Sequence, residues 1–165
     1  MDKTTVKFQA GQKPKAPSGM LREQETGTLP EPFRERINIS SGRLFGSNCI
    51  GTALYITGER KIDGTVDTFE AHNKYLKSLT EIKNPVVGCL VVWWGETVLL
   101  GDKTPKINVH HMGVVVSTDP LLVTNREGGD DEARNLVNEN ESFESLCNQY
   151  RRSKVSFYLP KALVW

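Results

Sequence analysis

Residues 86–94 (VVGCLVVWW) are an unbroken apolar run, and they constrain the fold of this chain more than any other segment. The run is rich in valine and tryptophan, which favour strands, and it follows Asn84-Pro85, a pair that ends a helix. A continuous apolar run, without alternation, is typical of a strand that is buried on both faces. We therefore predict a central strand over residues 86–94, with Cys89 in the core.

The other segments predict an α+β domain. Helical spacing is found over residues 67–82, where His72 lies near the apolar face as a half-buried structural residue, and again over residues 143–150. Helices followed by consecutive strands with short turns indicate a mostly antiparallel sheet. The further strands are predicted at residues 4–9, 97–100, 108–117, 121–124 and 155–159, with residues 162–165 docking as an edge strand.

Residues 1–37 are polar, weakly periodic and rich in lysine, proline and glycine. We expect them to form an extended N-terminal arm, followed by a single domain over residues 38–165. Such an arm could wrap around the domain, cover its active site or bind a protein partner.

The bulk composition is that of an ordinary globular domain. The 165 residues are 38% hydrophobic and 25% charged, with a formal net charge of +1. A dedicated nucleic-acid binder usually carries a basic excess, so this balance argues against one. The sequence has neither an apolar run of roughly 18 residues, the length that spans a bilayer, nor the apolar core of a secretory signal. We expect no membrane association, and a location that is cytoplasmic or reached by another delivery route.

Cysteines occur at positions 49, 89 and 147 only, without CxxC spacing. This set indicates neither a zinc site nor a disulfide framework, so we predict no metal, no cofactor and a reducing compartment.

Cys49 has the features of a reactive thiol. A glycine-containing loop leads into Asn48, a good N-cap residue, and Ile50, Ala53 and Leu54 then recur at helical spacing. Cys49 is therefore predicted in the first turn of a helix, where the macrodipole and the N–H groups favour an anion. Such a position lowers the pKa of a thiol and makes it a better nucleophile. The alternative is that Cys49 is a small hydrophobic residue packed beneath the helix.

The sequence also offers a general base for this thiol. His110 and His111 lie together on the strand predicted at residues 108–117, and alternation places them on opposite faces of the sheet. Asn125 ends the following strand and could lie beside His111. In a triad of this kind the imidazole deprotonates the thiol, and the amide orients the imidazole. A one-residue change of register would exchange the roles of the two histidines, and Asn125 could equally be a turn residue.

Residues near this predicted triad leave further alternatives open. Trp93 and Trp94 could line a substrate groove, although at least one of them is expected in the core. Arg126 and Glu127 could touch a substrate, but solvated loop charges are the commoner case.

The order and spacing of these segments resemble NlpC-type cell-wall peptidases and the related CHAP amidases of the papain-like group. Residues 48–51 (NCIG) resemble the Asp-Cys-Ser-Gly segment of these families, and residues 85–94 resemble their Pro-Gly-Asp-Leu-Val-Phe-Phe strand. Residues 111–116 (HMGVVV) resemble their His-Val-Gly-Ile-Tyr strand, and residues 121–125 resemble the strand that follows it. The resemblance covers residues 41–126, about half of the chain.

The resemblance implies a papain-like domain in which the helix that carries the nucleophile packs on a mostly antiparallel sheet. It implies hydrolysis of an amide or peptide bond, without a metal, with peptidoglycan stem peptides as the substrate class. Cys49 would be the nucleophile, His111 the general base and acid, and Asn125 the orienting residue. The backbone N–H of Cys49 and a donor from the preceding loop, such as Asn48, would meet the oxyanion.

Two other functions stay open. Asn48 and Ile50 stand where the resembled families have Asp and Ser. This difference favours a binding or inhibitory module that kept the fold and lost catalysis. Acyl transfer or thioester cleavage on the same fold is the other alternative, although permuted acyltransferases place histidine before cysteine.

Overall fold

The computed structural model describes residues 27–97, 101, 106–127, 135–151 and 153–164. Its centre is a six-stranded antiparallel sheet with the strand order β1-β6-β2-β3-β4-β5. The strands are β1 (Thr80–Ile82), β2 (Leu90–Thr97), β3 (Lys106–Thr118), β4 (Leu121–Arg126), β5 (Val137–Ser142) and β6 (Lys154–Leu159).

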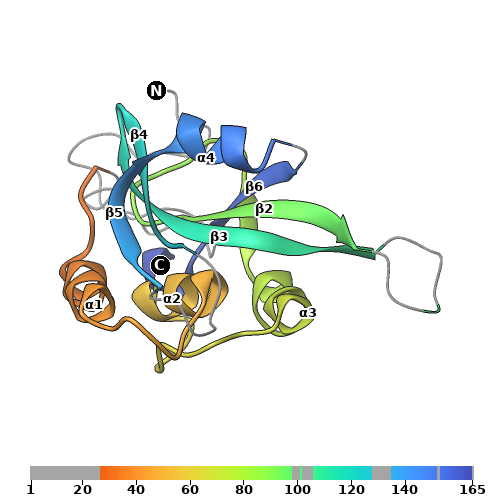
Figure 1. Cartoon of the computed structure of the whole chain (residues 1–165). Coiled ribbons are helices and arrows are strands. Elements are labelled where there is room, and N and C mark those ends of the chain that lie inside the picture. The colour runs from red at the N-terminus through yellow and green to blue at the C-terminus, as the bar shows by residue number, and fades with distance from the viewer. Residues whose placement is uncertain (1–26, 98–100, 102–105, 128–134, 152, 165) are drawn as a thin grey trace.

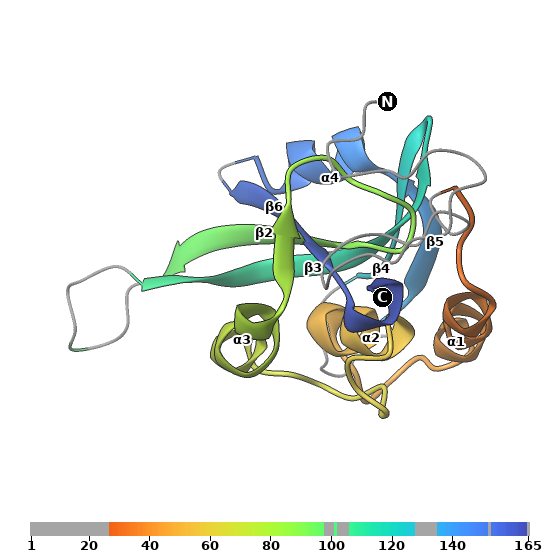
Figure 2. The ribbon, with the colours of Figure 1, turned by 180° about the vertical axis from the view of Figure 1, so that it is seen from behind.

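Helices lie on both sides of this sheet, and the α+β class predicted from the sequence is confirmed. Three of them, α1 (Glu31–Ser41), α2 (Cys49–Ile56) and α3 (Thr68–Glu70), form a row on one side, and α4 (Phe143–Gln149) lies on the other (Figure 1, and from behind in Figure 2). Within the described ranges, no helix has the length and apolar character needed to cross a membrane. The remaining helical segments are a π-helix (Ala71–Tyr75) and two 3-10 helices (Leu76–Ser78 and Lys161–Leu163).

The apolar run of residues 86–94 supplies the central strand, as predicted. Residues 90–93 are fully buried in β2, which has β6 on one side and β3 on the other. The strand begins at Leu90 rather than at residue 86, because Cys89 N–H donates to Val86 O over 3.1 Å in a turn. Residues 95–96 also pair with β3 and continue β2, so the strand does not end at residue 94.

Residues 31–41 form α1, which corrects the prediction of an extended arm through residue 37. Pro30 precedes this helix and Pro32 lies in its first turn, where a missing N–H costs no helical hydrogen bond. Phe33, Ile37 and Ser40 are buried, so one face of the helix joins the core. Residues 1–26, which include the strand predicted at residues 4–9, lie outside the described residues.

The helix predicted over residues 67–82 is wrong in its second half. Asp67 caps α3 by accepting a 2.7 Å hydrogen bond from Phe69 N–H. The backbone then widens into the π-helix, tightens into a 3-10 turn, and leaves as β1 at residues 80–82. Pairing with β6 competes with the helix there, and a helical spacing pattern does not reveal such a partner.

The C-terminal region departs from the prediction in two places. The strand predicted at residues 155–159 is present as β6, but the tail is a 3-10 helix rather than an edge strand. Leu163 is buried close to Gly88 and Phe33, so the tail folds back on the core instead of pairing. The edge strand β5 is not predicted, because its sequence VNENES has no apolar alternation and its pairing with β4 alone defines it.

Candidate active site

His111 and Asn125 are joined by a buried hydrogen bond. His111 Nε2 lies 2.9 Å from Asn125 Oδ1, and both residues are at most 3% exposed. Asn125 Nδ2 donates to the Glu141 carboxylate over 3.1 Å, which turns the amide oxygen toward the imidazole. Because that oxygen can only accept, Nε2 carries the ring hydrogen and Nδ1 carries the lone pair. The basic nitrogen of the imidazole is therefore Nδ1.

Gly113 allows β4 to place Asn125 beside His111. A Cβ at position 113 of β3 would lie 2.5 Å from Val123 Cγ1 and 3.2 Å from Asn125 Cβ. The first distance is far below ordinary carbon contact, so a side chain there would push β4 away. The close approach of β3 and β4 thus explains why residue 113, two residues after His111, is a glycine.

Cys49 is the first residue of α2, as predicted, and Asn48 is its N-cap. Asn48 Oδ1 accepts hydrogen bonds from Gly51 N–H over 2.8 Å and from Val66 N–H over 3.2 Å. Asn48 Nδ2 donates to Val66 O over 2.9 Å. The side chain of Asn48 therefore ties the start of α2 to residue 66 and positions Cys49, whose own side chain is largely buried.

Cys49 and His111 line the same pocket, which has a volume of about 500 Å³. Tyr150 also lines it and stacks on the imidazole of His111, with ring centroids 4.6 Å apart and ring planes inclined by 15°. Trp93 packs against the same imidazole at a centroid distance of 5.5 Å. Two of the three predicted triad residues thus line the pocket, and the third, Asn125, holds the imidazole by a hydrogen bond.

Burial sets the protonation of both rings. Burial lowers the pKa of His111 below its ordinary value of 6.5, and the hydrogen bond to Asn125 and the negative charge of Glu141 offset only part of this effect. Burial also raises the pKa of Tyr150 to about 12, with contributions from negative charge at Cys49 and Glu141. Near neutral pH, His111 is an unprotonated base beside a neutral phenol.

A β-bulge separates the two neighbouring histidines. Trp93 pairs with His111 and Trp94 pairs with Val109, so His110 is an extra residue on β3. His111 is 1% exposed, whereas His110 is exposed and its ring lies over Gly95. The hydrogen bond to Asn125 belongs to His111, and His110 lines the pocket without it.

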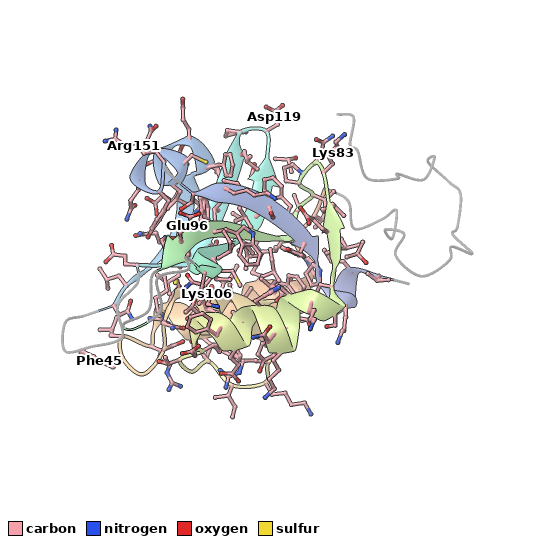
Figure 3. The ribbon with its side chains drawn as sticks, turned by 90° about the vertical axis from the view of Figure 1, so that its right-hand side faces the viewer. Phe45, Lys83, Glu96, Lys106, Asp119 and Arg151 are labelled. Atoms are coloured by element: carbon pink, nitrogen blue, oxygen red, sulfur yellow. The ribbon has the colours of Figure 1, made fainter. Side chains whose placement is uncertain are left out.

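Trp94, predicted as a substrate contact, does not line the pocket of Cys49. Its indole Nε1 donates to Ser156 Oγ over 3.1 Å, and its ring meets His72 edge-on. It borders a second cavity of about 590 Å³, which His110 also lines. This second cavity includes Glu96, near the end of the β2–β3 hairpin that points at the viewer in Figure 3. A role of Trp94 in substrate binding stays a prediction that depends on this cavity.

Arg126, the residue after Asn125, forms a buried ion pair with Asp63 that the sequence does not reveal. Arg126 is fully buried, and its Nη2 lies 3.3 Å from Asp63 Oδ2. The prediction that Arg126 is a solvated loop charge or a substrate contact is therefore wrong. The hydroxyl groups that also donate to the Asp63 carboxylate are those of Ser47 (2.6 Å), Thr52 (2.8 Å) and Ser40 (2.8 Å).

Arg126 uses all five of its N–H donors within the chain. Besides Asp63, its acceptors are Thr52 Oγ1 and the backbone oxygens of Ser40, Arg43 and Asn135. Arg126 follows Asn125 directly, and Ser47 directly precedes Asn48. The network therefore connects the strand that carries the orienting amide with the loop that leads to Cys49.

The other two cysteines, Cys89 and Cys147, are not among the residues that line the pocket of Cys49. Cys89 is fully buried, and burial raises the pKa of its thiol to about 12. Cys147 is half-buried on α4. Among the residues that the structure describes, no three His, Cys, Asp or Glu side chains come together as a metal site.

A scan against protein-family models, a search of curated proteins and a search of solved structures each found no match for this chain. The function of the site must therefore be argued from its residues and their geometry.

Proposed function

We propose that this chain is a cysteine hydrolase that cleaves an amide or peptide bond, with Cys49, His111 and Asn125 as its triad. The observation that carries the proposal is the hydrogen bond from His111 Nε2 to Asn125 Oδ1, which leaves Nδ1 basic in the imidazole that lines the pocket of Cys49. A thiol at a helix N-terminus, a neutral imidazole and an orienting amide are the groups that nucleophilic catalysis by cysteine requires.

In the acylation step, His111 Nδ1 takes the proton of the Cys49 thiol, and the sulfur attacks the substrate carbonyl carbon. The carbonyl electron pair moves to oxygen, where the N-terminal end of α2 and the backbone N–H of Cys49 stabilise the negative charge. The oxyanion then collapses, the C–N bond breaks, and the proton on Nδ1 passes to the leaving amine. The products of this step are a thioester on Cys49 and a free amine.

Hydrolysis of the thioester uses the same groups in the same roles. His111 Nδ1 takes a proton from a water molecule as the water oxygen adds to the thioester carbon. The C–S bond breaks, and the proton on Nδ1 returns to the sulfur. A carboxylic acid is released, and the thiol and the neutral imidazole are restored.

We further propose that the domain is papain-like and related to NlpC-type peptidases, with peptidoglycan stem peptides as its substrate class. In support, α2 packs against β3 and β4, the adjacent antiparallel strands that carry His111 and Asn125. The cell-wall substrate follows from the sequence resemblance over residues 41–126.

Cys49→Ala in the full-length chain tests the nucleophile. We expect the variant to lose hydrolysis of peptidoglycan stem peptides by about four orders of magnitude or more, because none of the other described residues that line the pocket carries a thiol to form the thioester. Iodoacetamide labelling at neutral pH tests the thiol without a substrate. We expect Cys49 to be alkylated ahead of Cys89 and Cys147, and more slowly in His111→Ala, where the base is absent.

Cys147→Ser is the matched control, because it removes the more accessible of the two remaining thiols and leaves the pocket intact. It should retain both activity and Cys49 labelling. Preferential labelling of Cys147, together with undiminished activity in Cys49→Ala, would contradict the proposal. Alkylation of Cys49 no faster than that of an ordinary thiol would favour a binding module.

A further inference from the structure

Tyr150 lines the pocket but has no role in the triad. Its ring is stacked almost parallel to the imidazole of His111, with centroids 4.6 Å apart. It follows α4, so it reaches the imidazole from an element other than the strands that carry His111 and Asn125. Arg151, the next residue, lies on the α4 side of the molecule in Figure 3.

We propose that Tyr150 is a positioning residue of this site, whose ring covers one face of the His111 imidazole, excludes water from it and holds its plane. The inference rests on the proposed function, because Tyr150 acts through the general base. The hydroxyl of Tyr150 has no part in this role.

The geometry explains why the imidazole needs this contact. The hydrogen bond to Asn125 fixes Nε2 but allows the ring to tilt about that bond. Tyr150 and Trp93 also contact each other, with centroids 5.9 Å apart, so the three rings form one cluster. The cluster restricts the tilt, and loss of the Tyr150 ring would open one face of the imidazole to the pocket.

Exclusion of water has a chemical consequence. Burial is the main cause that lowers the pKa of His111, and Tyr150 is the ring stacked directly on it. Tyr150 therefore keeps His111 neutral, the form that accepts the thiol proton, at pH values where an exposed histidine is partly charged. The titratable groups that line the pocket beside His111 are Cys49, Asp67, His110 and Tyr150 itself, and Glu141 acts on the imidazole by its charge.

Tyr150→Ala and Tyr150→Phe separate the ring from the hydroxyl. The titration of His111 in the full-length protein is followed by NMR with isotope-labelled histidine. In Tyr150→Phe the midpoint should stay at its wild-type pH, because the ring cover is kept. In Tyr150→Ala the midpoint should move to higher pH, because water reaches the imidazole. The acid limb of kcat/KM should move in the same direction, and kcat should fall by roughly tenfold.

Phe143→Ala is the matched control, because Phe143 packs against Trp93 and Phe157 in the same aromatic cluster. It should lower stability without moving the titration of His111. If Tyr150→Ala does not fold, Tyr150→Leu replaces it, with a smaller shift in the same direction.

An unchanged His111 titration in the Ala or Leu variant overturns the inference. A Tyr150→Phe variant that shifts as far as Tyr150→Ala also overturns it, in favour of the hydroxyl. The titration needs no turnover, so its outcome is independent of the Cys49→Ala result. The role of Tyr150 can fail while Cys49 proves to be the nucleophile, and the His111 titration can shift while Cys49→Ala leaves activity unchanged.

Discussion

Asn125 lies between an imidazole and a carboxylate, and this placement decides which nitrogen of His111 is basic. Glu141 Oε1 accepts from Asn125 Nδ2 over 3.1 Å and from Asn138 Nδ2 over 3.2 Å. The negative charge of Glu141 also raises the pKa of His111 against the larger effect of burial. Glu141 therefore acts on the base twice, once by orienting the amide and once by its charge.

Glu141→Gln separates these two effects. A glutamine oxygen can still accept from Asn125 Nδ2, but the charge that favours the imidazolium is lost, so the pKa of His111 falls further. We expect the acid limb of kcat/KM and the NMR titration of His111 to move to lower pH. The depressed pKa of His111 also makes folding depend on pH. The neutral imidazole contributes stability above pH 6.5, and this contribution is lost as the pH falls through the folded pKa.

Glu139→Gln is the control on the same strand, with the same change of charge. Glu139 accepts from Ser41 Oγ over 2.8 Å rather than from the triad. The acid limb should stay in place in this variant. A movement of the limb to higher pH in Glu141→Gln, or equal movements in both variants, would show that the charge of Glu141 does not act on His111.

Among the elements, α2 depends strongly on its N-cap because it has only eight residues. Asn48→Ala removes all three hydrogen bonds between the Asn48 side chain and residues Gly51 and Val66. We expect the free energy of unfolding to fall by about 1–2 kcal/mol in urea titrations. Alkylation of Cys49 by iodoacetamide should also slow, because a frayed first turn no longer holds the thiol in the field of the helix.

Ser142→Ala makes the matched comparison at α4. Ser142 caps that helix by accepting a 3.2 Å hydrogen bond from Ser145 N–H, away from Cys49. This variant should lose some stability and keep the wild-type rate of Cys49 alkylation. Equal alkylation rates in Asn48→Ala and Ser142→Ala would mean that the cap of α2 does not position the thiol.

The parts of the site that the sequence predicts are those with local signals. The apolar content of residues 90–93 is enough to indicate a central strand, and Asn48 before a helical pattern is enough to indicate the start of α2. Asn125 is found by its place at the end of a short strand. These signals depend on neighbours in the chain, so they can be recognised without knowledge of the fold.

The parts that the sequence misses depend on distant partners. The bulge at His110 is a property of the pairing between β2 and β3. Tyr150 continues the helical spacing of α4, and only the packing of that helix places its ring on His111. In the sequence, Arg126 lies just after the strand predicted at residues 121–124, as a loop charge would. Only the folded structure shows that side chains and backbone carbonyls from several segments enclose it.

At the scale of the whole molecule, the Asp63–Arg126 pair connects α1, the loop before α2, α2 itself and β4. Burial raises the pKa of Asp63, but the hydrogen bonds from Ser47, Ser40 and Thr52 and the charge of Arg126 outweigh it. The pKa of Asp63 is therefore below its ordinary value of 3.8. The carboxylate contributes stability above that pH, and this contribution is lost as the pH falls through the folded pKa.

A double-mutant cycle on this pair measures how strongly Asp63 and Arg126 are coupled. Asp63→Asn leaves the Arg126 charge buried without its counter-ion, and Arg126→Met does the same to the carboxylate, so each should lower the free energy of unfolding by about 3–5 kcal/mol. The double variant removes both charges and should lose clearly less than the sum of the two single variants. Urea unfolding at pH 7 gives the three values, and additivity within about 0.5 kcal/mol would contradict the coupling. Repeating the urea titration at progressively lower pH adds a second check, because the coupling should shrink as the pH falls through the folded pKa of Asp63.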